Sequence, residues 1–333
     1  SRVIGIIKLP SVTGYLLIGL LLGPSVTNIV TSETVDELSK VFTPVILGVI
    51  AYMIGGNLPL STLKGLKKNI LIITIFEGGF AWLFALLLVT FVSPILLPGL
   101  SLDFKTALTM GIVIGGISLA TAPAVTMAII EELKVRGPLP TTLLGVVALD
   151  DALAIIAFAI SIGVGAGILG NDMTASPMQL VTKEIFAICM SILMGIVLGY
   201  GLVFIGRLTR NKQELLVLIL GTIIISSEIS SIFNLFPLLT NMTLGFTVVN
   251  RSKQSEDNVG ILTDIQEVMF SLFFSLAGAH LDLRVIESAG LLALLIVLGR
   301  SGGKLIGAWV GATVSGAPQV VRRYLGFTLM PKA

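Results

Sequence analysis

Charged residues are scarce in this chain of 333 residues. They make up 12% of the sequence, against about 25% in an average soluble domain, and 55% of the residues are hydrophobic. This composition excludes a soluble enzyme and predicts a protein that lies in a membrane. The sequence shows no phosphate-binding motif and no nucleophile placed beside a base, so we expect neither an enzyme nor a bound cofactor.

Cysteine and histidine each occur once. Cys189 has no second cysteine to pair with, and we predict that it is a small packing residue within a helix. His280 stands beside Asp282 at a predicted helix boundary, which favours an interfacial position. The net charge of +2 and the lack of a basic run argue against a nucleic-acid partner.

Long apolar runs occupy much of the remaining sequence. A helix needs about 20 residues to cross the hydrocarbon core of a bilayer, and these runs are long enough. The chain is therefore predicted to be an all-α polytopic membrane protein. The clearest runs cover residues 70–92, 107–130, 139–168, 185–205 and 291–314.

Glycine, proline and charged residues divide the chain into about 12 predicted helices. The first and last look incomplete because the chain begins and stops inside apolar stretches, so we expect it to be part of a longer protein. The predicted helices cover residues 1–8, 11–23, 40–57, 68–92, 105–131, 139–168, 183–207, 213–233, 236–250, 263–281, 288–315 and 319 onward.

Lysine and arginine alternate between rich and poor connections. Fourteen of them fall in one set of connections and four in the other, which assigns the rich set to the cytoplasm. We therefore expect a multi-pass protein of the cell membrane whose full-length N-terminus is not cytoplasmic. The poor set holds Lys40, Lys105, Lys183 and Arg284.

Glycines recur at spacings that place them on one helix face, as in Gly111 and Gly115, Gly195 and Gly199, and the series Gly303, Gly307 and Gly311. Small residues let membrane helices approach closely, so plain helix packing is the favoured interpretation.

Six charged residues lie far from predicted helix ends, where each costs about 2.5–3.5 kcal/mol to insert. Four are acids and two are bases, so full ionisation leaves two surplus negative charges that protons or a small cation must neutralise. A site that binds either a proton or a small cation, but not readily both, would exchange one for the other. The six residues are Glu77, Asp150, Asp151, Glu228, Arg300 and Lys304, and the roles of Glu77, Glu228 and Arg300 stay open.

The adjacent pair Asp150 and Asp151 is the strongest candidate site. Neighbouring helical side chains point about 100° apart, so both carboxyl groups can border one cavity and titrate as a coupled pair. Lys304 follows Arg300 by one turn on the same face, which suits a buried ion pair.

Pro123 interrupts the helix that precedes the acidic one. It lacks an N–H and leaves the carbonyl of Leu119 without a partner, and membrane helices tolerate such breaks where they line a protein cavity. Unwound carbonyls and the Thr121 hydroxyl are suitable ligands for a hard cation. Pro331 is a candidate for a second break that crosses the first, as inverted repeats produce.

Several short motifs in this order resemble the membrane domain of monovalent cation/proton antiporters, of the bacterial sodium/proton antiporter type. The likeness covers nearly the whole chain. It rests on Leu9-Pro10 with Gly14, Gly19 and Gly23-Pro24, on Thr121-Ala122-Pro123-Ala124, on Leu149-Asp150-Asp151-Ala152, on Phe273-Phe274 with Gly278 and Asp282, and on Arg300 with Gly303-Lys304 and Gly307.

This resemblance implies an inverted-repeat fold with two crossed broken helices. Residues 1–333 would form one membrane transport domain, in which 68–168 and an incomplete 288–333 build a moving core. The remaining helices would be a scaffold through which a homodimer forms.

The resemblance also implies residue roles. Asp151 would be the principal ion ligand, Asp150 would take part and pair with Lys304, and Thr121 would lie at the first crossover. Paired aspartates are typical of electrogenic Na⁺/H⁺ exchange, with Li⁺ as a second possible substrate. K⁺/H⁺ exchange and a gated K⁺ channel on the same fold are the alternatives. The surplus of acids argues against an organic-anion carrier or receptor, because an organic anion needs cationic groups.

Overall fold

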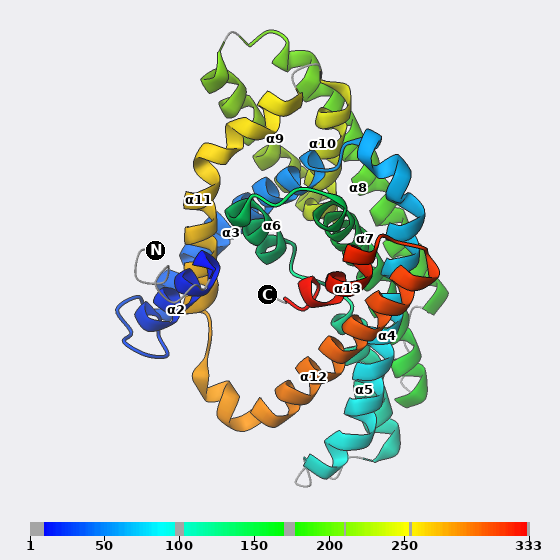
Figure 1. The fold of residues 1–333 in the computed structure, drawn as a ribbon. Coiled ribbons are helices and arrows are strands. Elements are labelled where there is room, and N and C mark those ends of the chain that lie inside the picture. Colours follow the sequence, from blue (N-terminus) through cyan, green and yellow to red (C-terminus); the bar gives the residue numbers. More distant parts are fainter. Residues whose placement is uncertain (1–9, 97–102, 170–176, 210, 253–254, 332–333) are drawn as a thin grey trace. The chain divides into compact units, whose positions relative to one another are not determined.

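The computed structural model describes residues 10–96, 103–169, 177–209, 211–252 and 255–331. Within these ranges every regular element is a helix (Figure 1), which confirms the all-α prediction for them. Seven helical stretches in the described ranges are long and apolar enough to cross a bilayer. The helix predicted at residues 1–8 lies outside the described residues.

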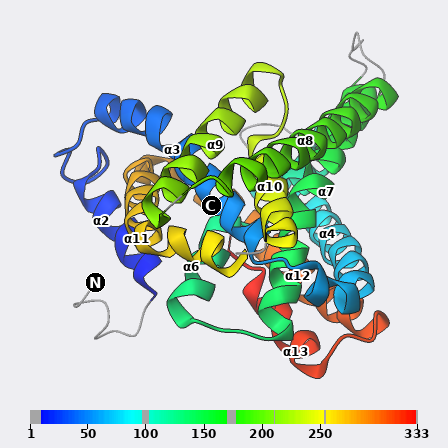
Figure 2. The same cartoon turned by 90° about the horizontal axis from the view of Figure 1, so that it is seen from above.

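The chain divides into two compact units, and the first contains Ser1–Leu60, Pro123–Val135 and Met190–Val285. Inside it, α10 lies along α3 and α2 lies along α11 (Figures 1 and 2). The helices of this unit are α2 (Ser11–Leu22), α3 (Ser32–Gly56), α6 (Pro123–Leu133), the later part of α8 (Pro177–Gly206), α9 (Lys212–Ile232), α10 (Pro237–Arg251) and α11 (Ser255–Ala279).

The second unit contains Ser61–Ala122, Arg136–Cys189 and Ile286–Ala333. It includes much of the predicted core, although α6 clusters with the first unit. The assignment of a moving core and a scaffold stays a prediction. The helices of the second unit are α4 (Leu60–Leu96), α5 (Phe104–Ser118), α7 (Pro138–Leu169), the early part of α8, α12 (Leu283–Val314) and α13 (Gln319–Thr328).

Several helices begin before the apolar run from which they were predicted. Helix α3 starts at Ser32 rather than at residue 40, because Thr31 caps it by accepting a hydrogen bond from the Thr34 backbone N–H at 3.4 Å. Asp103 caps α5 in the same way, and the hydroxyl of Thr106 lowers the pKa of this exposed carboxyl. Polar caps extend helices beyond the part that hydropathy identifies.

Cys189 corrects one prediction. Its side chain is exposed on α8 rather than packed in a core. Helices in a bilayer carry apolar residues on both faces, so hydrophobic character alone does not tell a residue facing the protein from one facing lipid.

The break near Pro123 is present. Helix α5 ends at Ser118, and α6 begins with Pro123 as its first residue, where a missing N–H costs nothing. Residues 119–122 therefore form an interruption between two helices, as the sequence predicted. This interruption brings Thr121 into the second unit, where it is buried.

Glycines allow α12 to pack closely on α4. A Cβ atom at Gly303 would lie 2.5 Å from the carbonyl oxygen of Phe80 and 2.7 Å from the Cα of Ala81. One at Gly307 would lie 2.6 Å from the Cα of Glu77. The two backbones thus touch, which explains the glycine spacing seen in the sequence.

Replacing Gly303 with alanine should destabilise the protein, because the new methyl group meets the α4 backbone, which cannot move aside as a side chain can. Overpacking of this kind costs about 1–3 kcal/mol. The matched control is Gly302→Ala, whose Cβ would lie 3.9 Å from Phe84 and should leave stability unchanged or raised. Thermal unfolding in detergent measures both, and equal melting temperatures for the two variants would contradict the close packing.

Candidate functional site

The ammonium group of Lys304 is the centre of a fully buried charged cluster. Its Nζ donates hydrogen bonds to Thr121 Oγ1 at 2.7 Å and to Asp150 Oδ2 at 2.9 Å, and it lies 2.9 Å from Glu77 Oε2. The side chains of Lys304, Asp150 and Glu77 are 0% exposed. Three oxygens therefore take the place of water around one ammonium group, which has three protons to donate.

Four segments of the second unit supply this cluster. Glu77 comes from α4, Asp150 from α7, Lys304 from α12, and Thr121 from the interruption between α5 and α6. The Thr121 hydroxyl donates to Asp150 Oδ2 at 2.5 Å while it accepts from Lys304. The contact between Asp150 and Lys304 that the family resemblance implied is thus present.

Two buried carboxylate oxygens in the cluster have neither a hydrogen bond nor an ion pair among the described residues. They are Asp150 Oδ1 and Glu77 Oε1. Buried polar atoms are nearly always satisfied, so such oxygens call for a proton or a cation. The orphaned oxygens lie on the two carboxyl groups that share Lys304.

Asp151 occupies a different position from its neighbour. Its side chain is half-buried on α7 and makes no hydrogen bond or ion pair within the described part of the chain. It is close enough to Asp150 and Lys304 to sense their charges. The Asp151 side chain is therefore partly accessible from outside the protein and also lies close to the buried cluster.

Arg300 contacts both the interruption before Pro123 and the residues that follow α13. Its guanidinium donates to the carbonyls of Ser118 and Ala120 at 3.1 and 2.9 Å. It also donates to the carbonyls of Met330 and Pro331 at 2.7 and 3.3 Å. These carbonyls flank the end of α5 and the end of α13, so one side chain satisfies freed backbone from both.

A backbone hydrogen bond connects the same two segments. The N–H of Ala122 donates to the carbonyl of Pro331 at 3.2 Å. The residues around Pro331, where a second break was predicted, therefore contact the first interruption. Arg300 occupies the carbonyls of Ser118 and Ala120, and the prediction that unwound carbonyls serve a cation stays a prediction.

The charge count also needs a correction. Glu228 is an exposed residue on α9 in the first unit, so it does not belong with the other deep acids. The second unit gathers Glu77, Asp150 and Asp151 with Lys304 and Arg300. Full ionisation of these five leaves one surplus negative charge rather than the two expected.

Glu77 is the member of the cluster whose role the sequence left open. A buried acid in the middle of α4 signalled a special position, but helical periodicity does not reveal which residue of another helix it meets. The glycine contact between Gly307 and the backbone of Glu77 is what brings α12 and its lysine to this acid.

His280 lies at a helix boundary, as expected. It belongs to the first unit, where its Nε2 lies 2.8 Å from Ser39 Oγ and its Nδ1 lies 3.8 Å from Asp36. The side chain is 45% exposed, which fits an interfacial residue.

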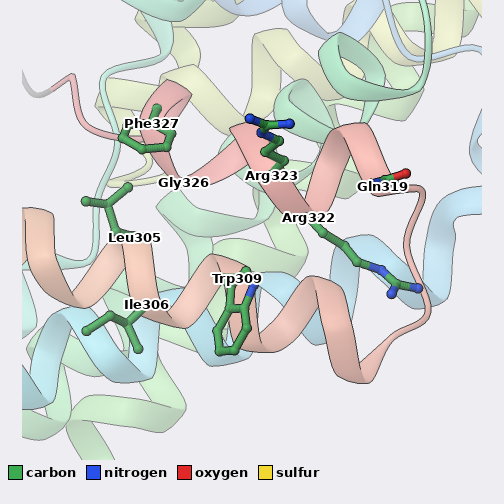
Figure 3. Close-up of a pocket in the computed structure, with 8 residues that line it drawn as sticks. All are labelled: Leu305, Ile306, Trp309, Gln319, Arg322, Arg323, Gly326 and Phe327. Atoms are coloured by element: carbon green, nitrogen blue, oxygen red, sulfur yellow. The ribbon is translucent and has the colours of Figure 1, made fainter.

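A surface groove of the second unit is lined by other residues than the charged cluster. It has a volume of about 510 Å³ between α12 and α13, and Figure 3 shows Trp309 of α12 and Phe327 of α13 among its lining residues. None of the buried charged residues lines it. The site identified from its chemistry is therefore distinct from this apolar groove.

Comparison with known proteins gives a family match. The family model described as sodium/hydrogen exchanger, transmembrane, matches residues 2–333. Sodium/hydrogen exchanger 9B1 of Homo sapiens is 27% identical over 196 residues, which are 56% of this chain and 36% of that protein. The chain thus spans about a third of the human relative's length. The probable Na(+)/H(+) antiporter GerT of Bacillus cereus is 23% identical over 92% of this chain and 77% of its own length.

A solved structure gives the fold. The sodium proton antiporter MjNhaP1 from Methanocaldococcus jannaschii, determined at pH 8, matches 98% of this chain and 77% of its own with a TM-score of 0.71 at 19% identity. This likeness confirms the predicted antiporter fold.

Replacing Arg300 with lysine should loosen both segments, because one ammonium group cannot reproduce a planar donor that reaches four carbonyls. Hydrogen bonds to a charged group contribute about 1.5–3 kcal/mol each, so we expect a lower melting temperature. Hydrogen exchange should accelerate at residues 118–122 and 328–331. The exposed Arg207, changed to lysine, is the control. Unaltered exchange in both segments would show that their contact does not depend on the guanidinium.

Proposed function

Because the chain belongs to the sodium/hydrogen exchanger family, we propose that it is a secondary active antiporter that exchanges Na⁺ or Li⁺ for H⁺ across the cell membrane. Ion and proton compete for Asp150 and Asp151, and the Thr121 hydroxyl is a third ligand. Each ligand is an oxygen, as a hard cation prefers.

The observation that carries this proposal is the charge deficit of the buried cluster. Three acids share two bases, and Arg300 is committed to backbone carbonyls, so Lys304 is the one base that contacts carboxylates among the five deep charged groups. One monovalent cation or one proton restores neutrality. An ion pair that was purely structural would have balanced charges and no orphaned carboxylate oxygen.

Alternation follows from the cost of burying charge. A cluster filled with a cation is neutral. A cluster whose two aspartates are protonated leaves only Arg300 in excess, and its guanidinium is satisfied by backbone carbonyls, so either form can reorient within the bilayer. An empty, charged cluster is held back by its desolvation cost. Exchange is therefore coupled, since each reorientation needs one of the two occupants.

We further propose that the exchange is electrogenic. With one cation bound, all five charged groups can be ionised while the cluster remains neutral, so Asp150 and Asp151 are both free to release protons. Two protons then return for each cation, and the return step carries one net positive charge. Neutralising the cluster requires one proton per cation. We propose a second proton because two adjacent aspartates can each carry one.

Orientation and assembly belong to the same proposal. The lysine and arginine distribution supports a non-cytoplasmic N-terminus for the full-length protein. We propose a homodimer that forms through helices outside the transport core, with no nucleic-acid partner. Membrane lipid and monovalent cations are the partners that the composition supports.

The direct test reconstitutes the protein in vesicles that contain a pH-sensitive dye. Asp151→Asn, which keeps the shape but removes the charge, should reduce Na⁺-dependent proton flux to that of empty vesicles. Glu228→Gln removes an exposed acid from outside the cluster and should keep wild-type flux. Wild-type exchange by Asp151→Asn would overturn the site assignment.

The same vesicles separate the alternative functions. Proton flux driven by K⁺ but not by Na⁺ or Li⁺ would identify K⁺/H⁺ exchange. Cation current without proton movement would identify a channel. An imposed membrane potential should change the rate of electrogenic exchange, and an unchanged rate would assign one proton per cation.

Competition between ion and proton sets the pH dependence. The acids of the site bind protons more fully as pH falls, so the apparent KM for Na⁺ should rise as pH decreases. One competing proton raises the KM by about tenfold per pH unit once the site is mostly protonated, and the two protons proposed here raise it by up to about a hundredfold per pH unit. At higher pH the KM should level off. A KM that stays constant across the acidic range would contradict shared ligands.

A further inference from the structure

Lys304 has two carboxylate partners, although one would neutralise it. Asp150 Oδ2 and Glu77 Oε2 each lie 2.9 Å from its Nζ, and none of the three side chains is exposed. Burying a second acid beside an ion pair is costly, because two carboxylates then repel each other in a medium of low dielectric. Such an arrangement needs a reason beyond stability.

Among the described residues, Lys304 is the one cation that pairs with Glu77. The other close charged neighbour of Glu77 there is Asp150, which repels it. Asp150, in contrast, also receives a hydrogen bond from the Thr121 hydroxyl. The two carboxylates that face the ammonium therefore differ in their partners. Asp150 is bonded by both Lys304 and Thr121, whereas Glu77 pairs with Lys304.

A cation that binds Asp150 must compete with the ammonium already there. Both carry a positive charge, and both need the oxygens of Asp150 and Thr121. If the ammonium moved away without a second carboxylate to bind, it would be left as an unpaired buried charge. Glu77 Oε2 already touches it, so only a small change in the lysine side chain separates the two arrangements.

We propose that Glu77 is a positioning residue that holds the Lys304 ammonium when a transported cation takes its place on Asp150, an inference that rests on the proposed antiport function. Glu77 does not bind the transported ion. It acts through Lys304, by giving the displaced ammonium a partner within the membrane. The cation therefore displaces the lysine from Asp150 without leaving a buried charge unpaired.

The test replaces Glu77 with glutamine and measures Na⁺-driven proton flux in vesicles over a range of Na⁺ concentrations. The apparent KM for Na⁺ should rise by about tenfold to a hundredfold, because Lys304 then has Asp150 as its one charged partner. Because the substitution also removes the surplus negative charge of the cluster, the KM rather than the kcat is the quantity that tests the role of Glu77. Thr74→Val is the matched control and should keep the wild-type KM. Thr74 is buried one turn away on α4, and within the described residues its hydroxyl bonds to the Ile70 carbonyl of its own helix.

A double variant distinguishes action through Lys304 from a general effect. In a Lys304→Gln background, radioactive Na⁺ binding in detergent should be the same with and without Glu77→Gln, since no ammonium remains to be held. A further loss of affinity in the double variant would overturn the proposal. Glu77→Asp covers the case in which Glu77→Gln does not fold. It keeps the charge on a shorter side chain and should raise the KM by a smaller factor, so an unchanged KM would also overturn the proposal.

The outcomes separate this inference from the function on which it rests. A normal KM in Glu77→Gln, with exchange still abolished by Asp151→Asn, would reject the role of Glu77 and keep the antiporter. A lower kcat at unchanged KM would reject it as well. Wild-type protein without any cation-dependent proton flux would instead reject the proposed function.

Discussion

A lysine ammonium without water around it is the constraint on which the rest of this structure depends. In a membrane interior its charge must be met by protein oxygens, and Thr121, Asp150 and Glu77 provide them. These residues come from three separate segments, so the lysine fixes the relative positions of α4, α7, α12 and the interrupted helix within their unit. The residues that form the site therefore also determine how these helices pack.

Close backbone packing makes this arrangement possible. Gly303 and Gly307 flank Lys304 in sequence, and both allow α12 to touch the α4 backbone. With larger residues the helices would stand apart, and the lysine would not reach Glu77. Arg300, one turn earlier, then lies where it can satisfy carbonyls of the interruption before Pro123 and of the residues that follow α13. The glycines that looked like ordinary packing residues therefore also position the two buried bases.

The sequence predicts local features of this protein well, and the family resemblance drawn from its motifs is confirmed. Pro123 predicted the break because proline acts on its own helix. Asp150 and Lys304 were identified because a buried charge is costly wherever it lies. What the sequence could not supply is which helix faces which. The pairing of Glu77 with Lys304 and the capture of the Ser118 carbonyl by Arg300 depend on that arrangement, and Glu228 was miscounted for the same reason.

The hydrogen bonds of Thr121 show how the expected ligands depend on one another. A threonine hydroxyl has one proton to donate, and Thr121 gives it to Asp150 while it accepts from Lys304. The oxygens of Thr121 and Asp150 that a cation would use are thus both engaged by the same ammonium. If that ammonium moves to Glu77, both oxygens become available in one step, and if it returns, both are withdrawn. Under the proposed function, a site built in this way would not hold a cation and the lysine together on Asp150, and this mutual exclusion would allow the cation to be released as well as bound.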